Sequence, residues 1–148
     1  MRRIEESVLI DAPRDVAWRT FTDLTCWADW NSVLTGVLPG ADQLLAGGSG
    51  FSCRLNPFGV AVPFSVRVEL AEPPSRLLWV GARWGVRGRH WFHFSDQEGG
   101  TRCESLEDLS GPTVALAGPL FPMWRFRQLT RRFLLDLKGE AERRAAGG

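Results

Sequence analysis

The sequence contains no tyrosine, two histidines and three cysteines, so few residues are available for redox or metal chemistry. Cys26, Cys53 and Cys103 have no paired spacing, and no Cys/His ligand pattern accompanies them. Three cysteines in this arrangement favour a reducing compartment, in which the thiols pack as small apolar groups. We therefore expect a fold that needs no disulfide.

Motifs for nucleotide binding and zinc-dependent catalysis are absent as well. The sequence has no Walker-type phosphate loop, no glycine pattern of a dinucleotide fold and no HExxH pair. No serine, histidine and acid stand in an arrangement beyond chance that predicts a nucleophilic triad. His90 and His93 would lie on opposite faces of a strand, where they cannot readily share one metal ion. We therefore expect no metal and no cofactor.

A strong charge of one sign and a long apolar run are also missing. Lysine and arginine number 18 and acidic residues 17, so the net charge of +1 gives no general field that attracts nucleic acid or an anionic membrane. Residues 1–7 are unlike a signal peptide, and no apolar run approaches a membrane span. We expect a cytoplasmic protein without integral membrane association or nucleic-acid binding.

Arginines gather in two places in spite of this balance. They are Arg83, Arg87 and Arg89, and, in a helical pattern, Arg125, Arg127, Arg131 and Arg132. A solvated surface is the ordinary interpretation of both groups, and a basic rim around the mouth of a pocket is the alternative. Seven tryptophans and nine phenylalanines provide enough aromatic area to line more than an ordinary core.

A chain of 148 residues has the length of one domain with a sizeable core, and we expect a single domain over residues 1–148. Apolar residues at alternate positions predict strands, and apolar residues at three- and four-residue spacing predict helices. The predicted strands cover 3–10, 34–38, 50–56, 62–71, 76–84, 87–96 and 101–109. The predicted helices cover 13–22, 24–30 and 122–145, with Asp11 and Asp23 as caps of the first two.

This order predicts an α+β fold, with a curved antiparallel sheet of about seven strands around a long C-terminal helix and two short helices after the first strand. Incomplete closure of such a sheet leaves a cavity between sheet and helix. Phe126, Leu129 and Phe133 share the apolar face of the last helix, and we expect them to form the cavity floor.

A strong hairpin signal at residues 97–100 fixes the pairing of the strands beside it. It places Phe94 opposite Cys103, Phe92 opposite Ser105 and His90 opposite Glu107, all on one face. Because this face carries phenylalanines, we expect it to be the concave one, with His90 and Glu107 inside the cavity.

A second turn at residues 72–75 predicts another register. It places Leu70 opposite Leu77, Val68 opposite Trp79, Val66 opposite Gly81 and Phe64 opposite Arg83. Arg83 would point inward near the pocket mouth, where it can neutralise Glu107 or hold a ligand carboxylate. A slip of one residue would place Trp84 inside instead.

His90 and Glu107 should be paired, because burying either charge alone is costly. Such a pair can orient a ligand carbonyl or hydroxyl, or it can serve as general acid and base. A polar pair that only braces two strands is an equally open alternative.

Several stretches resemble the START/Bet v 1-like superfamily (SRPBCC), and more narrowly its polyketide cyclase/dehydrase-type branch. They are VLIDAPRDVAWRTFTDLTCWADWN (8–31), GRHWFHF (88–94), GTRCESLEDLSG (100–111) and LKGEAE (137–142). The resemblance implies a helix-grip fold and matches His90 and Glu107 to polar positions of the family. Ser32 stands where proline is usual. The fold hosts lipid carriers, hormone-binding proteins and aromatic-ring cyclases, so it does not name a reaction.

Other residues have predicted structural or binding roles. Asn31 is expected to brace the loop after the second helix through bonds to the backbone. Besides the His/Glu pair, the residues expected to contact a ligand are Trp30, Phe51, Cys53, Phe64, Val66, Val68, Trp79, Arg83, Phe92, Cys103, Ser105, Phe126, Leu129 and Phe133. Plain core packing is the alternative for each apolar member, above all for Trp30.

Three functions are compatible with these patterns. The first is a carrier or sequestering protein for an apolar or aromatic small molecule, such as a lipid or polyketide. The second is a cyclase/dehydratase-type enzyme in which His90 and Glu107 move protons. The third is an interaction module, for which the sequence shows no additional domain or tail. An apolar small molecule is the expected partner, and a homodimer is compatible with the sequence.

Overall fold

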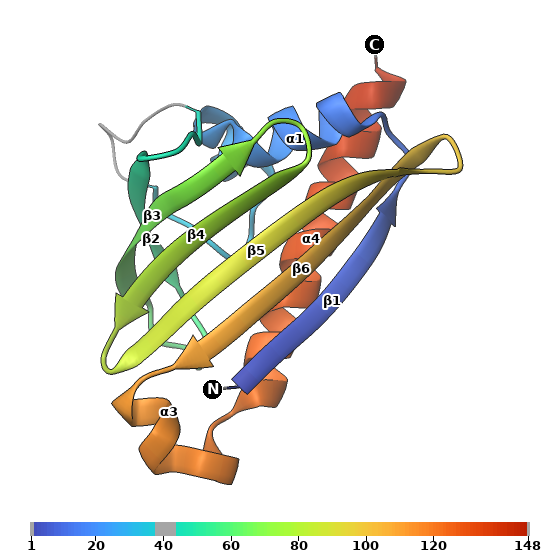
Figure 1. Cartoon of the computed structure of the whole chain (residues 1–148). Coiled ribbons are helices and arrows are strands. Elements are labelled where there is room, and N and C mark those ends of the chain that lie inside the picture. The colour runs from blue at the N-terminus through green and yellow to red at the C-terminus, as the bar shows by residue number, and fades with distance from the viewer. Residues whose placement is uncertain (1, 38–43, 148) are drawn as a thin grey trace.

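The computed structural model describes residues 2–37 and 44–147, in which a six-stranded antiparallel sheet curves around one long helix (Figure 1). The strands are β1 (Arg2–Ile10), β2 (Gly50–Leu55), β3 (Val62–Glu72), β4 (Arg76–Arg83), β5 (Val86–Gln97) and β6 (Gly100–Ser110). The helices are α1 (Arg14–Thr22), η1 (Leu24–Cys26), α2 (Trp27–Trp30), α3 (Pro112–Ala117), η2 (Gly118–Leu120) and α4 (Met123–Ala146), where η marks a 3₁₀ helix. In the order β1-β6-β5-β4-β3-β2, α4 lies along one face and α1 covers the upper end of that face.

The predicted helix-grip fold is confirmed, but the sheet has six strands rather than seven. Within residues 34–37 the chain makes an isolated bridge between Thr35 and Arg54 instead of a strand, and residue 38 lies outside the described residues. Gly36 has a backbone φ of +62°, a left-handed conformation that turns the chain out of the extended path. The predicted strand therefore cannot continue beyond Thr35.

The helices follow the prediction closely, with two additions, α3 and η2. Asp23 caps η1, since its carboxylate accepts a hydrogen bond from the Thr25 N–H at 3.0 Å. The cap predicted for Asp11 is wrong, because α1 has Pro13 at its N-cap position and no side chain caps it. The backbone N–H of Asp11 donates to Glu142 of α4 at 2.7 Å. The unpredicted helix α3 begins at Pro112, whose fixed φ suits a first helical turn. No helix within the described residues is long and apolar enough to span a membrane.

The β3–β4 register departs from the prediction at one point. Val68 lies opposite Trp79 as predicted, whereas Leu70 faces Leu78 instead of Leu77. A register shift between Val68 and Leu70 inserts an extra residue into β3, which is the signature of a β-bulge. The predicted pairs Val66–Gly81 and Val68–Trp79 are therefore confirmed, Leu70–Leu77 is wrong, and the predicted Phe64–Arg83 pair is not among the partners of β3 and β4.

An aromatic layer fills the upper half of the space between the sheet and α4. Phe21 of α1 lies at its centre, with its ring centroid 4.6 Å from that of Phe92 and 6.1 Å from that of Phe133. Trp27 adds contacts of 5.2 Å to Phe51 and 6.1 Å to Phe133. Because these rings stand between the sheet and α4, they hold the helix away from the sheet and fill only the end of the space nearest to α1 and α2.

The second half of α4 carries a buried carboxylate. Glu140, whose side chain is 9% exposed, accepts hydrogen bonds from Arg143 at 2.7 and 2.8 Å and from Arg144 at 3.0 Å. The hydrogen bond from Arg143 and, to a lesser degree, that from Arg144 hold the pKa of the Glu140 carboxyl below its usual 4.5, against the opposite effect of burial.

The substitution Glu140→Gln should lower the free energy of unfolding by about 1 kcal/mol at pH 7, because the charge that strengthens the three hydrogen bonds from Arg143 and Arg144 is lost. A carboxyl whose pKa is depressed in the folded state contributes stability above its unfolded pKa near 4.5 and loses it as the pH falls through the folded value. Urea unfolding should therefore show a difference from the wild type that shrinks below that pH. Glu69→Gln, on the exposed side of β3, is the matched control, and an effect of Glu140→Gln that persists undiminished at low pH would contradict this account.

Candidate ligand-binding cavity

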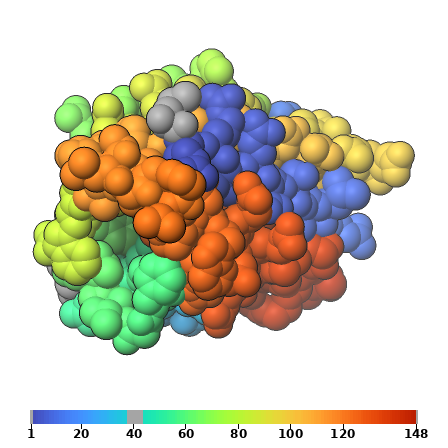
Figure 2. Space-filling model, turned by 90° about the horizontal axis from the view of Figure 1, so that it is seen from below, coloured from blue at the N-terminus to red at the C-terminus, as the bar shows by residue number. Residues whose placement is uncertain are grey.

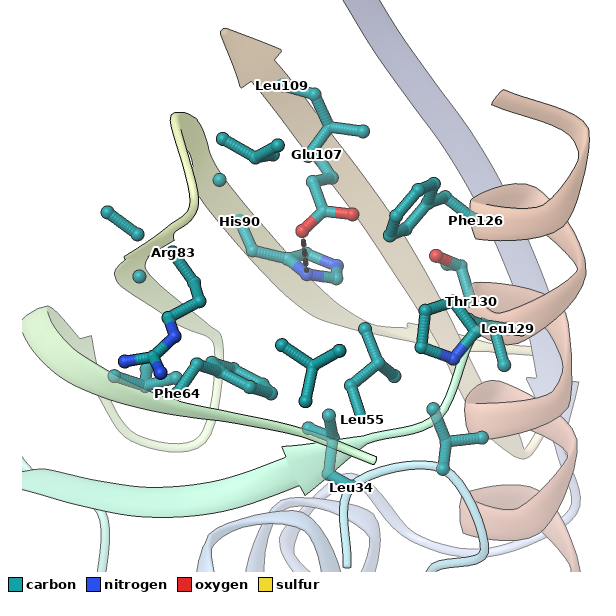
Figure 3. Close-up of a pocket in the computed structure, with 18 of the residues that line it drawn as sticks. Leu34, Leu55, Phe64, Arg83, His90, Glu107, Leu109, Phe126, Leu129 and Thr130 are labelled. Atoms are coloured by element: carbon teal, nitrogen blue, oxygen red, sulfur yellow. Dashed lines mark ion pairs between the residues drawn. The ribbon is translucent and has the colours of Figure 1, made fainter. Parts of the chain in front are cut away.

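A cavity of about 420 Å³ lies between the sheet and the N-terminal half of α4, in the space that the aromatic layer leaves unfilled (Figure 3). This volume falls in the range of small-molecule sites. Residues of β2 to β6 form one wall and α4 forms the other. Ten of the residues predicted to contact a ligand or carry chemistry line it: Phe64, Val66, Trp79, Arg83, His90, Phe92, Glu107, Phe126, Leu129 and Phe133.

Six predicted residues lie outside the cavity wall: Trp30, Phe51, Cys53, Val68, Cys103 and Ser105. Four of them, Phe51, Cys53, Val68 and Cys103, are buried in the hydrophobic core. Trp30 packs against Trp27 and Phe133, at centroid distances of 6.0 and 5.7 Å. Phe51, Cys53, Val68 and Cys103 lie on the concave side as predicted, but they pack in one core cluster with side chains of α1 and α2 instead of lining the cavity.

His90 and Glu107 form the polar centre of the cavity. The β5–β6 register places them opposite one another as predicted. Oε2 of Glu107 lies 3.3 Å from Nδ1 of His90, and the two side chains are 19% and 11% exposed. The His90 ring stacks on Phe92 at a centroid distance of 4.1 Å. Figure 3 shows the pair facing the cavity opposite Thr130 of α4, so polar groups meet an otherwise apolar space from both walls.

Ser105 supports the pair from behind. Its hydroxyl lies 2.5 Å from Nε2 of His90, so the imidazole stands between this hydroxyl and the carboxylate of Glu107. The residue is 2% exposed. The order of contacts, hydroxyl to Nε2 and carboxylate to Nδ1, is that of a nucleophilic triad, but a triad needs a hydroxyl that reaches the substrate. Here the hydroxyl is buried, and it is the carboxylate that lines the cavity. Ser105 is therefore a positioning group for His90, a contact that the sequence analysis missed although Ser105 and Glu107 share one strand face.

The close approach of Glu107 to the sheet depends on Gly88. A Cβ atom at this position would stand 3.1 Å from Oε2 of Glu107. Gly88 precedes His90 by two residues, so the two share one face of β5. The missing side chain leaves the carboxylate room to lie against the strand, beside the imidazole.

Arg83 lies at the mouth of the cavity rather than beside the pair. It is exposed, and its guanidinium lies over the ring of Trp84 at 5.5 Å. Glu107 pairs with His90, so the predicted neutralisation of Glu107 by Arg83 does not occur. Both Arg83 and Trp84 line the cavity, because the β4–β5 turn curls over its opening.

Other wall residues were not identified from the sequence. Thr130 directs its hydroxyl into the cavity (Figure 3). The sequence feature that could have identified it is a threonine within the apolar face of the last predicted helix. Val33 and Leu34 enter the wall because Asn31 accepts hydrogen bonds from their N–H groups at 3.0 and 2.9 Å, the brace predicted for this asparagine. Phe58 also lines the cavity. It belongs to an apolar loop between β2 and β3, for which no role was predicted.

The fold and the cavity define a helix-grip protein with a largely apolar internal cavity and one polar pair inside it. The sequence matches the family described as "Polyketide cyclase / dehydrase and lipid transport" over residues 1–142. The chain belongs to this family, and its role is hydrophobic ligand binding or cyclisation. No curated protein is significantly similar to it in sequence.

Solved structures with the same fold share little sequence with the chain. The Zhui aromatase/cyclase from Streptomyces sp. R1128 is 19% identical, with a TM-score of 0.82 over 99% of this chain and 98% of its own. A Thermus thermophilus protein is 15% identical, with a TM-score of 0.78 over 95% and 97%. A Chromobacterium violaceum protein is 16% identical, with a TM-score of 0.75 over 96% and 99%. At this level of identity the likenesses establish the fold alone.

The packed positions of Cys53 and Cys103 make a prediction about thiol reactivity. Burial raises the pKa of the Cys53 thiol to about 12, and burial together with the charge of Glu104 raises the pKa of Cys103. Because the thiolate is the reactive form, iodoacetamide at pH 8 should modify the partly exposed Cys26 and spare the other two. Mass spectrometry of the native protein should find one adduct, and of the urea-unfolded protein three. If Cys53 of the native protein were modified as fast as Cys26, the core around β2 would be accessible to solvent, and the prediction would be wrong.

Proposed function

We propose that the protein is a carrier or sequestering protein for an apolar or aromatic small molecule, such as a lipid or a polyketide. The observation that supports this proposal is the cavity of about 420 Å³ whose lining is apolar except for Arg83, His90, Glu107, Thr113 and Thr130. Transfer of an apolar molecule from water into such a space is favourable by roughly 25 cal/mol for each Å² buried. The cavity therefore supplies affinity without demanding one chemical structure.

The polar groups would set the orientation of the ligand. Glu107 and His90 stand on the sheet, and Thr130 stands on α4. A ligand hydroxyl or carbonyl placed between the two walls finds a hydrogen-bonding partner there, whereas a pure hydrocarbon leaves these groups without a ligand partner. Molecules with an apolar body and one oxygen-bearing end fit this arrangement best.

Filling the cavity should abolish binding while leaving the fold intact. Leu34→Trp places an indole in the cavity wall, and it should weaken binding of the apolar fluorescent probe N-phenyl-1-naphthylamine by about tenfold or more. Leu135→Trp is the matched control, because Leu135 is 54% exposed and lies outside the cavity wall. Equal affinities for the probe in both variants would remove the basis for a site between the sheet and α4. Native mass spectrometry of the purified wild type should also find a co-purified apolar compound.

A second candidate is a cyclase/dehydratase-type enzyme, favoured by the 3.3 Å separation of two partly exposed acid–base groups. In a dehydration, the Glu107 carboxylate would take a proton from the carbon beside a carbonyl, and the freed electron pair would form the new double bond. The hydroxyl on the next carbon would leave with a proton from the His90 imidazolium, so water is released. Ser105 would hold the imidazole in place for this step.

The variants Glu107→Gln and His90→Phe separate the two candidates. For a carrier, Glu107→Gln should weaken binding of an aromatic β-hydroxy ketone by about tenfold, the loss of one charged hydrogen bond, and leave N-phenyl-1-naphthylamine binding unchanged. If the protein is a carrier, the wild type should form no enone from the β-hydroxy ketone, as measured by the absorbance of the enone. Enone formation by the wild type that both variants abolish, with ketone affinity retained, would replace the carrier by the enzyme.

A further inference from the structure

Three segments frame the mouth of the cavity: residues 56–61 between β2 and β3, residues 82–87 at the β4–β5 turn, and residues 111–127 around α3 and the start of α4. We name them the mouth rim. Six of the nine exposed large apolar side chains of the described residues belong to it: Phe58, Val60, Trp84, Leu116, Leu120 and Trp124, each 57–88% exposed. Figure 2 looks toward this end of the molecule and shows the segments around a hollow. Single exposed leucines are ordinary, but apolar side chains gathered around one opening mark a contact surface.

Bonds between the segments hold the mouth rim in shape. The Thr113 hydroxyl of α3 donates to the Trp84 carbonyl at 2.6 Å, and the Thr113 N–H donates to the Gly85 carbonyl at 3.0 Å. Trp84 keeps a φ of +52°, which a bulky residue adopts only when its surroundings impose it. On the other side, Nε of Arg125 donates to the Pro57 carbonyl at 2.5 Å. The apolar side chains are thus presented outward by a braced backbone.

The charges of the mouth rim all have one sign. Residues 56–61, 82–87 and 111–127 contain Arg83, Arg87, Arg125 and Arg127 and no aspartate or glutamate, although the whole chain has a net charge of +1. Arg83, Arg87 and Arg127 are exposed, and Arg125 is half-buried. Of the acidic residues in the adjoining strand β6, Glu107 lies in the cavity beside His90, and Asp108 is paired with Arg3. The rim segments themselves therefore carry only positive charge, which favours contact with an anionic surface.

We infer that the mouth rim docks the protein on an anionic lipid bilayer. Tryptophan side chains are favoured at the level of the lipid headgroups, and protruding leucines gain from contact with the acyl chains. Arginines beside an anionic leaflet contribute about 1 kcal/mol each. Because the cavity opens at the centre of this surface, an apolar molecule passes between bilayer and cavity without crossing water. Docking itself rests on the rim alone, and the exchange of a ligand rests on the proposed function.

Sedimentation with lipid vesicles tests the docking. The wild type should bind vesicles of phosphatidylcholine and phosphatidylglycerol, and binding should fall several-fold at 0.5 M salt or when phosphatidylglycerol is omitted. The double variant Leu116→Ser/Leu120→Ser should lower binding by about tenfold or more, since both side chains are 88% exposed on the rim. The matched control, Leu9→Ser/Leu135→Ser, removes two leucines that are 54% exposed and belong to β1 and α4 outside the rim, and it should bind as the wild type does.

The same variants separate this inference from the proposed function. Leu116 and Leu120 do not line the cavity, so binding of N-phenyl-1-naphthylamine in the absence of vesicles should be unchanged by their substitution. Absence of wild-type binding to phosphatidylglycerol vesicles overturns the docking, even where the probe is bound. An equal loss of vesicle binding in the control variant overturns it too. Binding of an acidic protein by the mouth rim, without binding to vesicles, would also overturn it.

Discussion

The aromatic layer around Phe21 is the contact on which the cavity depends. Its ring stands between Phe92 of the sheet and Phe133 of α4, at centroid distances of 4.6 and 6.1 Å, and so sets the spacing of the two layers. No comparable wedge from α1 or α2 reaches the other half of the described structure, where about 420 Å³ stays unfilled. A close-packed interior has few voids of this size, because each loses the dispersion contacts of its lining. Packing at one end thus maintains an empty space at the other.

The polar pair owes its geometry to two neighbouring strands rather than to a loop. His90 and Glu107 face one another across the β5–β6 ladder, Ser105 holds the far nitrogen of the imidazole, and Gly88 leaves space for the carboxylate. Groups fixed on paired strands keep their distance when a ligand enters, and this favours orientation and proton transfer alike. The family to which the chain belongs includes both kinds of function, so the ligand decides between them.

The two ends of the molecule have different tasks. Near the upper end, the aromatic layer packs α4 against the sheet, and Glu140 with its two arginines stabilises the last turns of the helix itself. At the lower end, exposed tryptophans and other exposed apolar side chains gain little from burial in water, but they surround the opening of the cavity. A protein that only stored its ligand in water would gain nothing from this surface. Its position makes sense when the ligand arrives from, or leaves to, another apolar phase.

The sequence by itself determined the fold and the partners within the β5–β6 hairpin, because a tight turn and alternation of side chains are local properties. It therefore predicted that His90 and Glu107 meet, and that Phe126, Leu129 and Phe133 face them. The tertiary structure decided which half of the concave face is empty. Phe51, Cys53, Val68 and Cys103 have the pattern of cavity residues, but they are packed into one core cluster with side chains of α1, α2 and α4. It also brought together the mouth rim, since residues 56–61, 82–87 and 111–127 are separated along the chain and meet only when the sheet closes around α4.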